Sequence, residues 1–220
     1  MNNSLEYPLI NAIDLSHSYD YKLYSNIDFI LNSKQSIAIL GRSGSGKSTL
    51  LHNLSTFLPP VKGEVKILNK TIYNTNEEYI DKLRRFNIGI IFQSHYLFKG
   101  MRAIDNIKIA TMLSGEKLDL ELLKKFEIDN IIDQKISELS GGQQQRVSIV
   151  RVLSKKPNII FADEPTGNLD NETANLVMTE LLEYINKNNA GLIVVTHDES
   201  MAEMCDNIYK LENQKLIKLK

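Results

Sequence analysis

A glycine-rich segment that directly follows a short apolar run has the residue types needed to hold a nucleoside triphosphate. Residues 37–40 lead into GRSGSGKST, which satisfies the pattern GxxxxGK[ST] between a predicted strand and a predicted helix. Its glycines let backbone N–H groups turn toward phosphate oxygens, and the helix adds the positive end of its dipole. We expect Lys47 to reach the β and γ phosphates and Ser48 to bind Mg²⁺. The predicted phosphate-binding residues are Gly41, Arg42, Ser43, Gly44, Ser45, Gly46, Lys47, Ser48 and Thr49.

A second glycine-bearing segment lies far from the first and opens another predicted helix. The sequence LSGGQ at residues 139–143 has the form of an anion site at a helix N-terminus. One chain needs only one cradle for each triphosphate, so the second indicates a site for the nucleotide of a partner. We therefore expect two copies of the chain to enclose two ATP molecules. The residues assigned to this second cradle are Ser140, Gly141, Gly142 and Gln143.

Two adjacent carboxylates follow the apolar run 159–162. Ligands bind beyond the carboxyl ends of strands in open α/β sheets, so this position favours a catalytic site. We expect Asp163 to hold Mg²⁺ through its water shell and Glu164 to act as the general base on the attacking water. A solvated acidic strand end is the alternative for such a pair in isolation.

Together these motifs resemble those of the ABC (ATP-binding cassette) ATPase family, whose signature sequence is LSGGQ. The resemblance covers essentially the whole chain. It implies an α/β fold: a P-loop NTPase (RecA-like) core with a small antiparallel β subdomain and an inserted helical subdomain. It also implies an ATPase that uses ATP and Mg²⁺ and whose dimer closes on ATP binding and opens after hydrolysis.

Three further positions match smaller motifs of the family. Gln93 resembles its glutamine that senses Mg²⁺ and the attacking water, and His197 resembles its histidine that contacts the γ-phosphate. Asp170, in the sequence NLD at residues 168–170, resembles a residue of the interface between two copies. Alone, these would more often be a surface glutamine, a structural histidine and a helix N-cap. The predicted catalytic residues are Lys47, Gln93, Glu164 and His197, and the predicted Mg²⁺ residues are Ser48, Gln93 and Asp163.

An aromatic residue upstream of the phosphate loop is expected to stack on adenine. Tyr19 lies at the spacing where the family carries this aromatic. Stacking tolerates either face of the ring and needs no base-specific hydrogen bonds. Tyr21 and Tyr24 are close enough in sequence to take the same place.

The elements that position these residues alternate along the chain. Four short apolar runs, residues 37–40, 88–92, 159–162 and 192–196, predict buried parallel strands. Segments with helical spacing separate them, which predicts an α/β core. One such segment contains Leu50, Leu51, Leu54 and Phe57.

Other regions predict smaller units around this core. Residues 9–16 and 65–73 have the pattern of antiparallel strands, the latter turning near Asn69, and the C-terminal residues predict a hairpin. We expect a single ABC ATPase domain over residues 1–220, with the core and β subdomain at about 1–93 and 156–220 and the helical subdomain at about 94–155.

The composition limits the possible partners. The chain has 220 residues and a net charge of −1, so no global electrostatic attraction to nucleic acid is expected. Cys205 is the only cysteine, which excludes an intramolecular disulfide and fits a reducing compartment. No secretory signal or apolar run of about 20 residues is visible, so we expect a cytoplasmic protein, peripheral on the inner face of the membrane.

The resemblance therefore implies integral membrane permease subunits as partners. Their docking surface would include residues 94–105, where Tyr96, Leu97 and Phe98 supply apolar area. The alternative is that these three side chains pack inside the helical subdomain. The runs ADEPTGNLD and HYLF are most similar to the branch that includes lipoprotein-release, macrolide-export and cell-division cassettes, and to its lipoprotein-release group in particular. A cell-division or regulatory cassette that acts through a membrane partner without moving cargo is the alternative.

Overall fold

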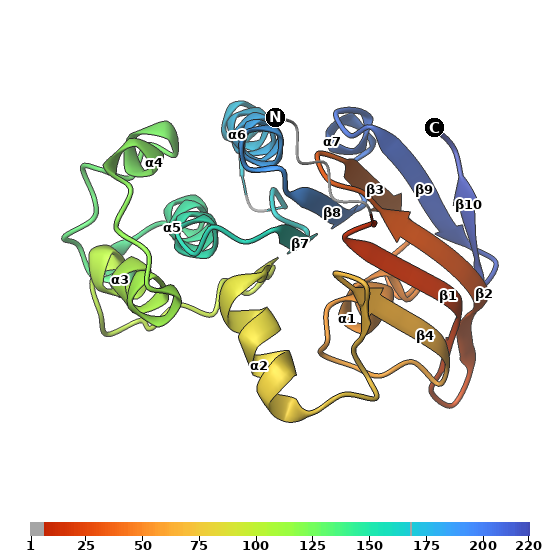
Figure 1. Cartoon of the computed structure of the whole chain (residues 1–220). Coiled ribbons are helices and arrows are strands. Elements are labelled where there is room, and N and C mark those ends of the chain that lie inside the picture. Colours follow the sequence, from red (N-terminus) through yellow and green to blue (C-terminus); the bar gives the residue numbers. More distant parts are fainter. Residues whose placement is uncertain (1–6, 168) are drawn as a thin grey trace.

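Two β-sheets organise the computed structural model, which describes residues 7–167 and 169–220 (Figure 1). The larger sheet has six strands and carries the strands predicted from the apolar runs. In order across that sheet they are β10 (Lys215–Lys218), β9 (Asn207–Glu212), β3 (Ser36–Leu40), β8 (Gly191–Thr196), β7 (Ile159–Asp163) and β6 (Ile88–Ile91).

The centre of the larger sheet is parallel, as predicted. β3 pairs with β8 and β9, and β7 pairs with β8 and β6, all in parallel register. Every residue of β3 and β8 is buried, which explains why both read as continuous apolar runs. The predicted C-terminal hairpin is confirmed by antiparallel pairing of β9 with β10, and β9 additionally extends the parallel sheet beside β3.

The smaller sheet is antiparallel, as the resemblance implied. Its strands, in order, are β2 (Lys22–Leu31), β1 (Ile10–Ser18), β4 (Lys62–Ile67) and β5 (Lys70–Thr71). The predicted turn near Asn69 is present, with Leu68 and Asn69 both in the left-handed region at φ of 50° and 63°. β2 was not predicted from the sequence.

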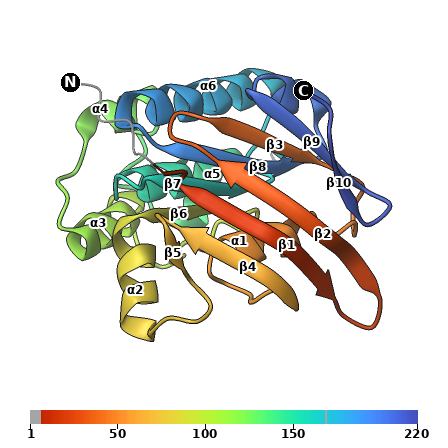
Figure 2. The same cartoon turned by 45° about the vertical axis from the view of Figure 1, so that its right-hand side comes forward.

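The alternation of side chains along β3 divides the core into two layers. Ile37 and Ile39 point into a cluster shared with α1 (Lys47–Leu54) and the antiparallel sheet. Ala38 and Leu40 point into the opposite cluster, which includes residues of the later helices. α1 therefore lies between the two sheets, behind the antiparallel one in Figure 2.

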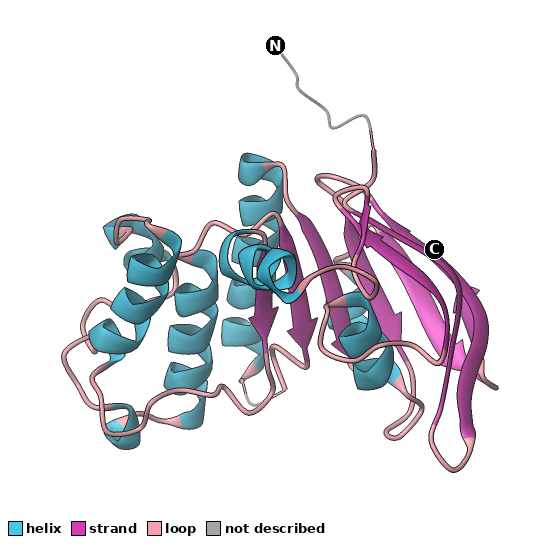
Figure 3. Ribbon diagram, turned by 60° about the horizontal axis from the view of Figure 1, so that its bottom comes forward, coloured by secondary structure: helices cyan, strands magenta, loops and turns pink. Residues whose placement is uncertain are grey.

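Apart from α2 (Glu77–Phe86), the remaining helices pack in the cluster on the other side of the larger sheet, whereas Leu83 of α2 belongs to the same cluster as α1. The helices α3, α4 and α5 stand together at one end of the molecule, and the sheets lie toward the other (Figures 1 and 3). The division of the chain at residues 94–155 stays a prediction. The helices other than α1 are α2 (Glu77–Phe86), α3 (Ala103–Ser114), α4 (Leu120–Lys125), α5 (Gly141–Leu153), α6 (Asn171–Asn188) and α7 (Glu199–Glu203).

Two local features differ from the sequence analysis. Phe57 does not continue the predicted helix, because α1 ends at Leu54 and Thr56 adopts a left-handed φ of 74°. The helix α2 was not predicted, since Leu83 is its only buried residue and charged residues dominate its sequence. None of the helices in the described part of the chain has the length and hydrophobicity that crossing a bilayer requires.

Candidate active site

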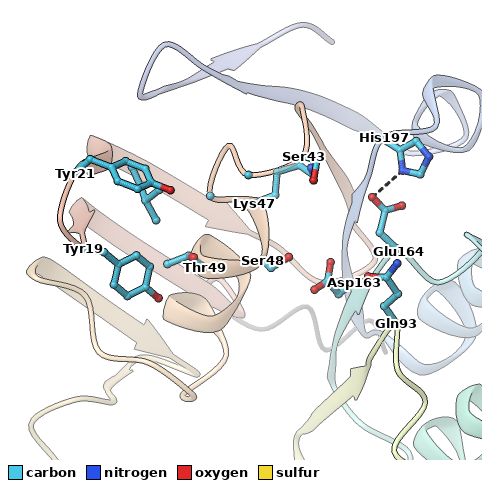
Figure 4. A pocket seen from close by; sticks show the side chains of 13 residues that line it. Tyr19, Tyr21, Ser43, Lys47, Ser48, Thr49, Gln93, Asp163, Glu164 and His197 are labelled. Carbon is cyan, nitrogen blue, oxygen red and sulfur yellow. Dashed lines mark hydrogen bonds and ion pairs between the residues drawn. The ribbon is translucent and has the colours of Figure 1, made fainter.

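The predicted phosphate loop, strand-end carboxylates and sensor residues meet around one cavity of about 600 Å³ (Figure 4). It lies where β3, β7 and β8 end, the edge at which α/β sheets bind ligands. Its lining residues are Tyr19, Tyr21, Leu23, Ser43, Gly44, Gly46, Lys47, Ser48, Thr49, Gln93, Asp163, Glu164 and His197.

The phosphate loop has a backbone path that excludes side chains at two glycines. A Cβ on Gly41 would lie 2.7 Å from Oγ of Ser45 and 2.9 Å from the carbonyl oxygen of Leu211. Gly46 caps the start of α1 with a left-handed φ of 96°, and a Cβ there would approach Leu23 at 3.3 Å. Gly41, Arg42 and Ser45 thus shape the loop, although they do not line the cavity.

Lys47 brings a positive charge into this loop. Its side chain is buried, and its Nζ donates hydrogen bonds to the carbonyl oxygens of Gly41, at 2.8 Å, and Arg42, at 3.1 Å. The Ser45 hydroxyl is buried and has no hydrogen-bond partner among the described residues. The Lys47 cation and the first N–H groups of α1 together form a site that fits a polyanion.

Ser48 and Asp163 face each other across the cavity from α1 and β7. Burial raises the pKa of the Asp163 carboxyl, and the neighbouring Ser48 hydroxyl opposes that rise. A desolvated carboxylate beside a hydroxyl is a donor set that suits Mg²⁺, which keeps several water and phosphate ligands and needs few from the protein. The described residues contain no group of three or more His, Cys, Asp and Glu side chains placed to hold a metal by themselves.

Glu164 is held by two groups at the end of the neighbouring strand β8. Its Oε2 accepts a hydrogen bond from the Thr196 hydroxyl at 3.0 Å, and its Oε1 lies 2.9 Å from Nδ1 of His197. The backbone of Glu164 is left-handed, with φ of 47°, and its N–H donates to the carbonyl of Val195. Thr196 was missed by the sequence analysis, because its contact depends on the register between β7 and β8.

Gln93 follows β6 and borders the cavity on the same side as Asp163 and Glu164 (Figure 4). The structure therefore brings together the four predicted catalytic positions, Lys47, Gln93, Glu164 and His197.

The three tyrosines considered for adenine have different environments. Tyr19 is 60 % exposed and Tyr21 is 64 % exposed, and both line the cavity. Tyr24 is fully buried, and its hydroxyl donates to Oδ1 of Asn53. Tyr24 is thereby excluded as a stacking residue, and Tyr19 and Tyr21 remain.

The second predicted cradle forms a separate cavity of about 370 Å³. Ser140 caps α5: its Oγ accepts from the N–H of Gln143, and the Gln143 side chain accepts from the N–H of Ser140. Asp170 caps α6 beside this cavity, accepting from the N–H and the hydroxyl of Thr173, while Asn168 lies outside the described residues. In the part of the chain that the structure describes, no residue lines both cavities. The lining residues here are Ser140, Gly141, Gly142, Gln143, Arg146, Leu169, Asp170 and Thr173.

Comparison with known proteins agrees with this geometry. The family model described as "ABC transporter" matches residues 24–167. The lipoprotein-releasing system ATP-binding protein LolD of Buchnera aphidicola is 33% identical, covering 98% of each chain. LolD of Xanthomonas campestris is 35% identical over 90% of this chain and 85% of that protein. The uncharacterized ABC transporter ATP-binding protein YbbA of Escherichia coli is 32% identical over 95% of this chain and 98% of that protein.

Solved structures give the same family. The ATP-binding cassette MJ0796, in a dimeric post-hydrolysis state bound to ADP and Pi, aligns with a TM-score of 0.87 at 30% identity, covering 96% of this chain and 99% of that one. The cassette cbiO1 of Clostridium perfringens, part of an ABC transporter complex, aligns with a TM-score of 0.82 at 29% identity. The alignment covers 96% of this chain and 88% of that one.

Proposed function

Because this chain belongs to the ABC transporter family and is one of its ATP-binding, ATP-hydrolysing subunits, we propose that it drives a separate membrane permease through ATP-dependent closure of a dimer. The observation that carries this proposal is the separation of the two cradles. The cavity at Lys47 and the cavity at Ser140 share no lining residue among those described, so one chain offers two half-sites.

In this proposal the first cavity binds ATP. Lys47 exchanges its contacts with loop carbonyls for the β and γ phosphates, and the N–H groups at the start of α1 bind the same oxygens. Tyr19 stacks on adenine, with Tyr21 as the alternative. The residues proposed for the nucleotide are those predicted from the sequence, with Gly41, Arg42 and Ser45 acting through the loop's shape.

Hydrolysis is assigned to the groups around Glu164. Its carboxylate takes a proton from the attacking water, and the contacts from Thr196 and His197 orient it for that step. Ser48, Asp163 and Gln93 would hold Mg²⁺, which when bound neutralises charge on the phosphate oxygens. Gln93 borders the same cavity, which supports the proposal that it senses the metal and the water.

The second cavity is proposed to receive the triphosphate of the other copy. Ser140, Gly141, Gly142 and Gln143 lie at the N-terminus of α5, where N–H groups and the helix dipole favour an anion. Asp170 borders the cavity and is proposed to lie at the interface between the copies. A complete ATP site thus needs both chains, so that ATP binding favours the closed dimer.

A groove of about 490 Å³ beside the active site is proposed as the permease docking surface. It is lined by Phe57, Phe92 and Tyr96, and it also reaches Gln93 and Asp163. Phe57 and Tyr96 are 49 % and 66 % exposed, and apolar grooves of this kind accept amphipathic helices. Leu97 does not belong to this groove, because it packs against the buried core instead.

We assign the permease to lipoprotein release, because two relatives bear the name lipoprotein-releasing system ATP-binding protein. The experiment is affinity purification of the chain from detergent-solubilised membranes of its own organism, followed by identification of the membrane proteins that co-elute. The proposal expects co-elution and ATP-dependent release of a lipoprotein from proteoliposomes. Co-elution without release would instead favour a regulatory or cell-division role, and a lack of co-elution would contradict the permease partner.

A further inference from the structure

The turn that follows Gln93 has an unusual backbone. His95 and Tyr96 are consecutive non-glycine residues with left-handed φ angles of 59° and 46°. The N–H of His95 donates to the carbonyl of Phe92, at 3.2 Å, so the turn closes directly over Gln93. Residues in this region of backbone space persist only where their surroundings hold them.

Side chains of α5 hold this turn. The Arg151 guanidinium donates to the carbonyl oxygen of Tyr96 at 2.7 Å and to that of His95 at 2.9 Å. The buried hydroxyl of Ser148 donates to the same His95 oxygen at 3.2 Å. Burial lowers the pKa of Arg151, but an arginine stays charged, so both bonds are charge-assisted. One planar group therefore fixes two successive carbonyls of the turn.

The same helix reaches the second half-site. α5 begins at Gly141, in the cavity proposed to receive the partner's triphosphate, and Arg151 lies roughly 15 Å further along its axis. In the proposed dimer, the N-terminus of α5 thus lies at one ATP site. Arg151, on the same helix, holds the turn that follows Gln93 at the other ATP site.

We infer that Arg151 is a positioning residue for ATP hydrolysis: it sets the backbone turn that places Gln93 and ties that placement to the position of α5. This inference rests on the proposed role of Gln93. Arg151 lines neither cavity and touches no reacting atom. Its effect on turnover must therefore pass through Gln93, whereas a merely structural arginine would act independently of it.

A double-mutant cycle separates these two roles. The variants are Arg151→Met, Arg151→Lys, Gln93→Ala and each arginine variant combined with Gln93→Ala. ATPase kcat and KM are measured on the full chain, together with binding of a fluorescent ATP analogue and thermal unfolding. The matched control is Lys155→Met, since the Lys155 ammonium also donates to two backbone carbonyls, those of Arg84 and Ile88, at the end of β6 opposite Gln93.

The inference expects Arg151→Met to lower kcat about 10- to 100-fold with little change in KM, because a displaced group loses catalytic power more than binding. In the Gln93→Ala background the same substitution should change kcat by less than about twofold, which is within the error of such cycles. Arg151→Lys keeps the charge on a single donor nitrogen and should give an intermediate kcat. This variant also tests the inference if Arg151→Met fails to fold. Lys155→Met should have equal effects in both backgrounds.

Equal losses from the Arg151 substitutions in both backgrounds would overturn the inference, and so would an unchanged kcat in Arg151→Met and Arg151→Lys. An unchanged kcat in Gln93→Ala alone would overturn the proposed role of Gln93 and the inference with it. The single Gln93 variant therefore distinguishes failure of the proposed function from failure of the positioning role.

Discussion

Glu164 and His197 meet across the ends of β7 and β8, with Oε1 of Glu164 2.9 Å from Nδ1 of His197. The Thr196 hydroxyl holds the other carboxylate oxygen, so both oxygens of Glu164 are engaged by one neighbouring strand end. The Glu164 side chain is 13 % exposed and that of His197 is 72 % exposed. The histidine therefore forms the open rim of the cavity, and the carboxylate is the oriented group behind it.

Glu164→Gln is expected to reduce ATP turnover by about 10²- to 10⁴-fold, the range for loss of a general base. ATP affinity should stay within a few-fold of wild type, because the phosphate loop is unchanged. Steady-state ATPase assays and equilibrium nucleotide binding measure the two quantities. Glu203→Gln, an exposed glutamate on α7, is the control and should behave as wild type. Wild-type turnover in Glu164→Gln would refute the assignment.

Lys47→Ala is expected to weaken ATP binding by about 10- to 100-fold, because a hydrogen bond to a charged group contributes roughly 1.5–3 kcal/mol. Titration with a fluorescent ATP analogue gives the affinity. Lys62→Ala removes a lysine whose side chain is 64 % exposed and paired with Asp14, so it serves as the control. Equal affinity of the Lys47 and Lys62 variants would contradict the phosphate site.

Tyr19→Ala should weaken ATP binding by about 5- to 100-fold, since stacking of a base on an aromatic side chain contributes roughly 1–3 kcal/mol. The Tyr19 ring already packs edge-on against His17, with ring centroids 5.0 Å apart, which restricts its orientation. Tyr19→Phe should retain affinity, because stacking needs no hydroxyl. Tyr21→Ala is the comparison, and a larger loss in that variant would move the stacking role to Tyr21.

The stability of the chain should rise between pH 8 and pH 10 through Lys155. Its ammonium donates to two carbonyls, yet burial and the nearby Arg151 charge lower its pKa to about 8 from 10.5. In that window the unfolded chain binds more protons at Lys155, so unfolding becomes less favourable with rising pH, by at most about 1.4 kcal/mol per pH unit. Denaturant titrations of wild type and Lys155→Met at both pH values measure it. An identical pH dependence in the two proteins would contradict the shift.

The sequence predicted the residues whose roles depend on local pattern. Lys47 and Ser48 stand in a contiguous motif, and Asp163 and Glu164 follow an apolar run, so their place at strand ends could be inferred. β2 escaped prediction because its pairing with β1 contains register shifts, and Leu23 and Tyr24 are both buried before regular alternation begins.

Contacts between distant segments could not be predicted in the same way. The hydrogen bond from Thr196 to Glu164 depends on β7 and β8 being neighbours, and the bonds from Arg151 to His95 and Tyr96 depend on how α5 packs. Neither relation leaves a motif in the sequence. Tyr24 illustrates the opposite situation. Its position in the sequence allowed it as the adenine-stacking residue, and only its burial in the structure excludes it.

The central claim is that each ATP site is completed by a second copy, and the mass of the ATP-loaded Glu164→Gln protein tests it most directly. Gly141 offers a matched disruption, because it lines the second cavity and a Cβ there meets no atom within 4 Å in the single chain. Gly141→Arg is therefore expected to fill this cavity without disturbing the packing of its own chain. With ATP and Mg²⁺, light scattering should give a dimer of the 25.0 kDa chain for Glu164→Gln and a monomer for Glu164→Gln with Gly141→Arg. Both variants should bind one ATP per chain. A monomer in both cases, even with the membrane subunits present, or a dimer in both, would contradict the account.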